Sequence, residues 1–247
     1  MINDYKSKLQ ELCLGLPLKD TEISENSLDL VLDKYPYAPY IPEDWNGYLV
    51  VAEAQQLNRN SQGNSVYVDG LLLGTVEELI FRLNNQKFNT GKVGITPWDD
   101  GHIKLAMLSC FPEINLDQVA VANAVPWFLN KTNTKQDKFL KKRSIEYWSE
   151  ILDLLNGKLK CVIRTGEYAR AILDYYKLKN KNIEKIFSLR SASQLERVSY
   201  VFDTDDLLNR YKEVENALST ERFSYDKKIK AGLVFYAAHA VSTINKK

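Results

Sequence analysis

Four short runs of β-branched and other apolar residues constrain the fold of this 247-residue chain more than any other feature. They lie at 48–54 (YLVVAEA), 119–125 (VAVANAV), 159–164 (LKCVIR) and 185–189 (KIFSL). Runs of this length and composition are typical of buried strands. Between and after them, apolar residues recur at helical spacing, which predicts helices at 75–83, 103–108, 144–155, 167–176, 203–218 and 225–244.

Strands that alternate with helices need crossover connections, which predicts a mostly parallel sheet with helices on both faces. We therefore expect an α/β fold, a single-domain α/β/α sandwich around a central four-stranded sheet. No repeat or linker divides the chain, so one domain is expected over 1–247, with a helical N-terminal extension at 1–34, a core at 35–220 and a C-terminal helix at 221–247. The core opens with 35–42 (YPYAPYIP), a predicted extended arm, because each proline disfavours helix at the preceding residue.

Charge and cysteine content exclude several classes of protein. The net charge of +1 gives no global basic surface, so a nucleic-acid role has to rest on a local patch. Cys13, Cys110 and Cys161 form no CxxC pair, which argues against a disulfide framework, a zinc site and an iron–sulfur cluster. The first residues, MINDYKSKLQ, lack the apolar core of a signal peptide, and no apolar run has the length of a membrane span. These features predict a cytoplasmic protein with no membrane partner.

Polar residues follow each predicted strand, and ligands of open parallel sheets bind at the carboxyl ends of strands. The four segments are 53–56 (EAQQ), 123–127 (NAVPW), 165–167 (TGE) and 190–193 (RSAS). None of them contains a phosphate-binding glycine motif or a nucleophile elbow, which argues against nucleotide-phosphate folds and serine hydrolases. Glu53 stands out, because an ionised group at the end of an apolar run is costly unless it has a partner or a task.

The chain has only two histidines, and neither has a second metal ligand at useful spacing, so no metal is expected. His102 follows Asp99-Asp100-Gly101 and is interpreted as the start of a helix. His239 lies in an alanine-rich helical segment and is interpreted as a packing residue.

The order and spacing of these segments resemble the uracil-DNA glycosylase superfamily, most of all its branch with a Gly-Glu-Ala-Pro-Gly motif. Residues 52–56 (AEAQQ) occupy the place of that motif, and 63–68 (GNSVYV) the place of Gly-x-Pro-Phe-Val-Gly. The family's Asn-x-Val matches 123–125 (NAV), and its strand-Gly-x-x-Ala-helix pattern matches 163–169 (IRTGEYA). The His-Pro-Ser or His-Pro-Ala motif after the last strand falls at 189–193 (LRSAS). The resemblance spans about 35–220.

The resemblance assigns chemistry to the first two motifs. Cleavage of an N-glycosidic bond builds positive charge on the sugar, and Glu53 is expected to stabilise that cation and to orient or deprotonate the attacking water. Asn123 is expected to read the edge of the extruded base. Val66 stands where the family has its stacking Phe, with Tyr67 one position away as a substitute. Gln55 and Gln56 are expected to shape the pocket floor.

The last motif departs from the family, because its histidine is absent. Arg190 or Leu189 takes that position, depending on a register of one residue that the sequence leaves open. Arg190 is expected to stabilise the anion of the leaving base or to hold a DNA phosphate. Ser191 or Ser193 is expected to donate to a phosphate beside the flipped nucleotide.

A basic run at 131–143 (KTNTKQDKFLKKR) follows the asparagine motif. Such a run is usually a solvated surface. At the rim of the expected pocket it would instead follow DNA phosphates, which makes binding salt-sensitive. The expected DNA contacts are Lys131, Lys135 and Lys138.

Other departures bear on the cofactor and the substrate. The branch has four iron–sulfur cysteines, and two of those positions are Trp127 and Trp148 here, so no iron–sulfur cluster and no other cofactor is expected. Val in place of Phe, together with Gln55 and Gln56, predicts a roomier and more polar pocket than one for uracil. We therefore expect a monomeric enzyme that removes a modified or damaged pyrimidine from DNA, such as a bulky phage-type cytosine in antiviral defence, and leaves an abasic site.

Several alternatives stay open from the sequence. The chain is alternatively a plain uracil-DNA glycosylase of base-excision repair, a catalytically inactive DNA-binding relative, or an enzyme of free nucleosides. Loss of the motif histidine favours the inactive relative. For single residues, Glu53 is alternatively a cap or a lysine partner, Asn123 a turn residue before Pro126, and Arg190 a surface residue.

Overall fold

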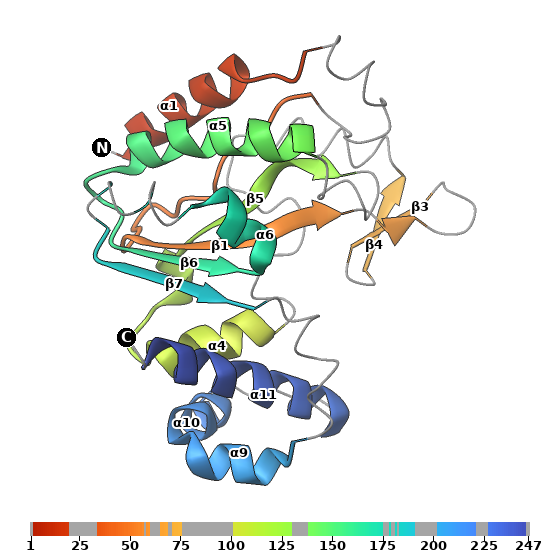
Figure 1. Ribbon diagram of the computed structural model, residues 1–247, viewed down its shortest axis with the longest axis vertical. Helices are drawn as coiled ribbons and strands as arrows, with labels where there is room; N and C mark the ends of the chain where they lie inside the picture. Colours follow the sequence, from red (N-terminus) through yellow and green to blue (C-terminus); the bar gives the residue numbers. More distant parts are fainter. Residues whose placement is uncertain are drawn as a thin grey trace. The chain divides into compact units, whose positions relative to one another are not determined.

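The computed structural model describes most of the chain in two compact units (Figure 1). The first unit comprises residues 1–95 and 118–186, and the second comprises 96–117 and 187–247. The residues that the structure describes are 2–19, 34–56, 58–59, 65–68, 71–75, 101–129, 138–174, 178, 181, 183–190, 202–220 and 227–245. Compactness does not decide whether a unit folds independently, so the single domain stays a prediction.

A four-stranded sheet confirms the α/β fold expected from the sequence. Its order is β5-β1-β6-β7, and β1 pairs in parallel with both β5 and β6. The strands are β1 (Tyr48–Gln56), β5 (Ala120–Leu129), β6 (Cys161–Thr165) and β7 (Lys185–Leu189). All four fall on the predicted apolar runs, and the bounds of β7 are those predicted.

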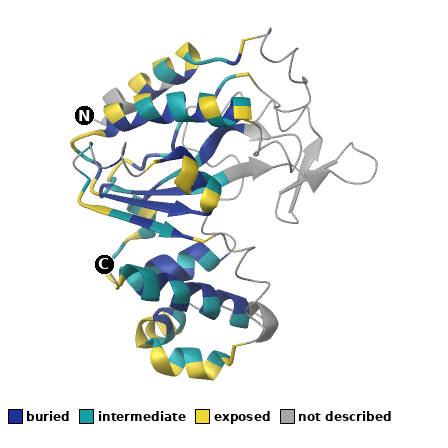
Figure 2. Cartoon of the chain, viewed as in Figure 1, coloured by how far each residue is buried: buried dark blue, intermediate teal, exposed yellow. Residues whose placement is uncertain are grey.

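Alternation along β1 separates the two faces of the sheet. Leu49 and Val51 point to one face and join the main core of the first unit. Helices α5 (Lys138–Leu155) and α6 (Glu167–Ile172) pack on this face, and α1 (Ile2–Gly15) packs against α5 (Figure 1). Helix α5 begins before the helix predicted at 144–155, and it turns Trp148, Ile151 and Leu155 inward, as the helical spacing predicts. Figure 2 shows the central strands as the most deeply buried part of this unit.

Aromatic residues with polar tips tie the arm to this core. Trp148 is 1% exposed, and its Nε1 donates to the carbonyl oxygen of Ala124 at 2.9 Å. Tyr147 packs edge-on against Trp148 and donates its hydroxyl to the carbonyl oxygen of Tyr37 at 2.6 Å. Each polar atom thereby finds an acceptor, as burial of such side chains requires. Trp127 is equally buried, so both tryptophans fill apolar volume inside the core.

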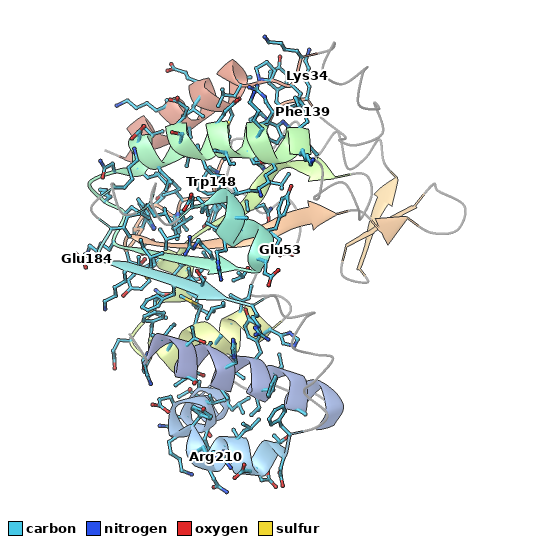
Figure 3. All side chains as sticks on the ribbon, in the orientation of Figure 1. Lys34, Glu53, Phe139, Trp148, Glu184 and Arg210 are labelled. Atoms are coloured by element: carbon cyan, nitrogen blue, oxygen red, sulfur yellow. The ribbon has the colours of Figure 1, made fainter. Side chains whose placement is uncertain are left out.

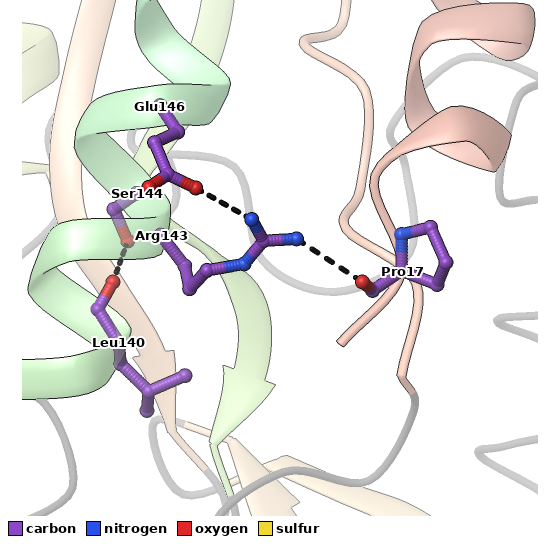
Figure 4. Close-up of polar contacts among 5 residues, drawn as sticks. All are labelled: Pro17, Leu140, Arg143, Ser144 and Glu146. Carbon is purple, nitrogen blue, oxygen red and sulfur yellow. Dashed lines mark hydrogen bonds and ion pairs between the residues drawn. The ribbon is translucent and has the colours of Figure 1, made fainter. Parts of the chain in front are cut away.

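The arm itself is extended, as its prolines predict. Tyr40 bridges Val121 of β5 in the antiparallel sense, with hydrogen bonds of 2.8 and 3.0 Å between the two backbones. Another contact joins the end of α1 to α5: Arg143 forms an ion pair with Glu146 and donates from Nη2 to the carbonyl oxygen of Pro17 at 3.1 Å (Figure 4).

The second unit is built from helices around its own core. These are α4 (His102–Cys110), α9 (Thr204–Arg210), α10 (Lys212–Thr220) and α11 (Lys227–Ile244). Leu105, Val214, Leu233 and Val234 form the centre of this core. The single helix expected at 203–218 is two helices, because Tyr211 leaves helical geometry between them. Among the described residues, no helix has the length and apolarity needed to cross a membrane.

A buried thiol predicts how stability responds to alkaline pH. The pKa of Cys161 is raised from 9.0 to about 12, mainly by burial; Lys185 lowers it and Glu184 raises it to a smaller extent. The folded protein therefore holds this proton more tightly than the unfolded chain does. The contribution of this thiol to stability is constant below about pH 9 and falls by about 1.4 kcal/mol per pH unit as pH rises from 9 towards 12. Urea unfolding at pH 8 and pH 10.5 measures this loss. The same loss in Cys161→Ala would contradict the assignment.

Candidate active site

Glu53 lies within β1 rather than at its end. Strand β1 continues to Gln56, two residues beyond the apolar run predicted at 48–54. The physical reason is the sequence itself: two glutamines stand where the resembled motif has Pro and Gly, and nothing ends the strand. On the side of β6, however, the last pair is Val51 with Arg164. Glu53 therefore lies past the paired part of β6, where the carboxyl end of that strand opens towards α6.

The carboxylate of Glu53 is half-buried and contacts the first turn of α6. Its Oε1 accepts a hydrogen bond from the backbone N–H of Tyr168 at 3.3 Å. The N–H groups of a first helical turn have no acceptor within the helix, so a carboxylate at this place satisfies one of them. Figure 3 labels Glu53 beside α6. Glu53 and Tyr168 are 115 residues apart in the chain.

Gly166 makes room for this carboxylate. It lies between β6 and α6 with φ of 89° and ψ of 163°, a backbone conformation that residues with a side chain rarely adopt. A Cβ at this position would lie 2.5 Å from Cδ and 2.6 Å from Cγ of Glu53. Just before it, the buried Thr165 donates from Oγ1 to the carbonyl oxygen of Val51 at 3.3 Å. The segments at 52–56 and 163–169 are therefore in contact, because the side chain of Glu53 occupies the space that a side chain at position 166 would need.

Asn123 is close to Glu53 in the sheet, but the two side chains point to different faces. Asn123 pairs with Ala52 in the parallel β1–β5 register. Paired residues of neighbouring strands share a face, and successive residues of one strand alternate. Asn123 therefore shares its face with Ala52, whereas Glu53 shares the face of Val51 and the α6 side of the sheet. The described residues bring the two motifs into adjacent strands without bringing these two side chains together.

Sequence reasoning missed Arg164. This residue is 4% exposed within a strand whose five residues are all buried, and its Nη1 donates to the carbonyl oxygen of Leu173 just after α6. Burial lowers the pKa of its guanidinium, Arg170 lowers it further, and Asp174 opposes the change. One signal was present in the sequence, namely an arginine at the end of the apolar run 159–164.

The segment that carries Val66 and Tyr67 forms a second sheet, which the sequence did not predict. Its strands are β2 (Asn58–Arg59), β3 (Ser65–Val68) and β4 (Leu71–Thr75), in the order β2-β3-β4 and antiparallel. Val66 and Tyr67 both lie on β3. Gln55 and Gln56 end β1, beside an irregularity in its pairing with β5. The side chains of these four residues lie outside the described part of the structure.

The other predicted site residues are placed only in part. Lys138 is exposed and begins α5, as expected for a residue at a solvated surface. Lys131, Lys135, Ser191 and Ser193 lie outside the described residues, as does most of the helix expected at 75–83. Their roles stay predictions.

Arg190 belongs to the second unit, where it is exposed and directly follows β7. Its carbonyl oxygen accepts a hydrogen bond from the hydroxyl of Tyr236 at 3.1 Å. The Tyr236 ring also packs edge-on against His102, with 5.8 Å between ring centroids. His102 begins α4, in agreement with its interpretation as a helix start.

Comparisons with known proteins add no relative. No family model, no curated protein and no solved structure matches this chain. The likeness to uracil-DNA glycosylases therefore stays a prediction from the sequence. Within the described residues, no three His, Cys, Asp or Glu side chains are grouped as metal ligands would be.

Proposed function

We propose that this chain is a DNA glycosylase that hydrolyses the N-glycosidic bond of a flipped-out modified or damaged pyrimidine and leaves an abasic site. The observation that carries the proposal is the Glu53 carboxylate, half-buried beside the carboxyl end of β6 and fixed by the Tyr168 N–H and by Gly166. Carboxyl ends of parallel strands are where α/β proteins bind their ligands. A fixed carboxylate at such a place is the group that glycosidic hydrolysis needs.

The proposed role of Glu53 follows from the charge that develops during the reaction. As the bond breaks, the sugar acquires oxocarbenium character, and a nearby carboxylate stabilises this cation. The same carboxylate orients or deprotonates the attacking water. One Glu53 oxygen accepts from Tyr168 at 3.3 Å, which sets the direction of the carboxylate plane. A group held in this way needs little reorganisation when the positive charge appears.

The remaining roles are proposed on the resemblance. Asn123 would bind the edge of the base. Because its side chain lies on the other face of the sheet from Glu53, the base would have to extend past the carboxyl end of β1. Arg190 would stabilise the departing base or hold a phosphate. We further propose that the protein acts on DNA in the cytoplasm as a monomer, with Lys138 among its phosphate contacts.

The proposed substrate is a pyrimidine larger than uracil, because valine and two glutamines replace Phe, Pro and Gly of the resembled motifs. The test incubates the purified protein with DNA duplexes that contain uracil, hypoxanthine, hydroxymethylcytosine or glucosylated hydroxymethylcytosine. Abasic sites are then scored as strand breaks after alkali. We expect breaks at a modified cytosine and none at uracil. Breaks at uracil alone would contradict the modified-base proposal and leave a plain uracil-DNA glycosylase.

A second candidate is a DNA-binding relative that has lost catalysis. Two observations favour it: the Glu53 carboxylate already satisfies a helical N–H, and Asn123 points to the other face. In that case no duplex in the panel is cleaved, and affinity for DNA is the same with and without the Glu53 carboxylate. Fluorescence anisotropy of a labelled duplex measures that affinity.

A further inference from the structure

Helix α6 has only six residues, and side chains from the sheet hold both of its ends. At its start, the Tyr168 N–H donates to Oε1 of Glu53. At its end, Nη1 of Arg164 donates to the carbonyl oxygen of Leu173, the residue that follows the helix. Because Arg164 pairs with Val51 in the β1–β6 register, it lies on the same sheet face as Glu53. The two side chains therefore hold α6 from one face.

Stability alone does not explain an arginine at this position. Removing a guanidinium from water is costly, and a well-packed apolar side chain of similar volume is often equally or more stabilising. Every residue of β6 is buried, so an apolar residue would suit the strand. Arginine supplies what an apolar residue lacks, a rigid donor directed at one backbone carbonyl. The contact at Leu173 thus indicates a requirement for geometry.

The geometry in question is the placement of a short helix. A helix of six residues is not stable by itself, and its position depends on what it packs against and on what holds its ends. Ala169 and Ile172 are buried and pack the helix against the core. Apolar contacts are non-directional, so they do not by themselves define the position of the helix along its axis. A hydrogen bond at the last turn helps to define that position. The first turn, with the N–H that holds Glu53, is positioned with it.

We propose that Arg164 is a positioning residue for Glu53 and acts through α6. Its guanidinium fixes the C-terminal end of the helix, and the helix in turn fixes the Tyr168 N–H against the carboxylate. The consequence for catalysis rests on the proposed function, whereas the consequence for the Tyr168 N–H does not. The two consequences are tested separately.

Hydrogen exchange of the Tyr168 amide, followed by NMR, tests the positioning directly. In Arg164→Met we expect this amide to exchange about tenfold faster or more, because the helix that carries it is no longer held at its C-terminal end. Glu53→Ala, which removes the acceptor, sets the upper limit. Arg164→Lys retains a donor and is expected to keep most of the protection. The matched control is Tyr147→Phe, which loses a buried hydrogen bond to a carbonyl elsewhere in the unit and is expected to leave the Tyr168 amide unchanged. Wild-type exchange of Tyr168 in Arg164→Met would overturn the proposal.

Kinetics on the duplex that the wild-type protein cleaves test the consequence for catalysis. We expect Arg164→Met to lower kcat by about 10²-fold with KM nearly unchanged, as for a small misplacement of a reacting group. In a Glu53→Gln background, Arg164→Met is expected to have no further effect, because the group that it positions is already lost. Additive losses in the double variant would overturn the proposal. If instead Glu53→Gln is as active as the wild type, the proposed function fails, and the exchange measurement still decides the role of Arg164.

Discussion

Replacing Glu53 by glutamine is expected to lower the rate of base release by about 10²–10⁴-fold, the usual contribution of a positioned acid or base. The amide of glutamine has the shape of the carboxylate, and its oxygen still accepts from the Tyr168 N–H. It carries no negative charge to stabilise a sugar cation and cannot take a proton from water. Single-turnover cleavage of a modified duplex, scored after alkali, gives the rate.

Glu167→Gln is the matched control for this substitution. Glu167 is an exposed carboxylate next to Gly166, in the first turn of α6, so its replacement changes the net charge by the same amount near the same end of this helix. We expect its rate to stay within about twofold of the wild type, since exposed substitutions have small effects. Equal losses in the two variants would show that charge near α6, rather than catalysis by Glu53, sets the rate. Unchanged DNA affinity together with no activity in any variant would favour the binding protein.

Gly166→Ala is expected to lower the free energy of unfolding by about 2–6 kcal/mol. At φ of 89° and ψ of 163°, a residue with a Cβ is strained by about 1–3 kcal/mol. Overpacking contributes about 1–3 kcal/mol more, because the new methyl group would lie within 2.6 Å of Cγ and Cδ of Glu53. The carboxylate has to move to admit it, so activity is expected to be lost as well. Urea unfolding followed by circular dichroism measures the stability.

Two further variants separate the strain from the contact. Gly157 has a φ of 95° and nothing within 4 Å of the position of a Cβ, so Gly157→Ala introduces the strain alone. We expect it to cost about 1–2 kcal/mol. In a Glu53→Ala background, which removes the contacted atoms, Gly166→Ala is expected to cost the backbone strain alone, about 1–3 kcal/mol. A full loss in that background would place the clash elsewhere than at Glu53.

The sequence predicted the sheet well because the information it needs is local. The four apolar runs of β-branched residues indicate strands whatever their position in the fold, and β7 has the predicted bounds. The two helices α9 and α10 show the limit of periodicity, since the same spacing continues across Tyr211 where the helix breaks. The small sheet of β2, β3 and β4 was not predicted, because its strands have only two to five residues, which are too few to show a clear alternation.

The candidate site was predictable only in its parts. A glutamate after an apolar run and a glycine after another are visible in the sequence, and each was noted separately. Their contact depends on the β1–β6 register, which no local pattern specifies. The face of Asn123 likewise follows from its pairing with Ala52, and one residue of register reverses it. The role of Arg164 depends on where α6 ends. The spacing of apolar residues predicted a helix at 167–176 and does not show that it ends at Ile172.

The separation of 115 residues between Glu53 and Tyr168 has a consequence during protein synthesis. Strand β1 leaves the ribosome long before either of its neighbours, β5 and β6, and it waits for both to complete the sheet. Contacts between such distant segments form late and slowly. A nascent chain that has not yet extended beyond α6 holds a glutamate with no amide to orient it. Truncated or stalled products would therefore carry the Glu53 carboxylate without the amide that orients it.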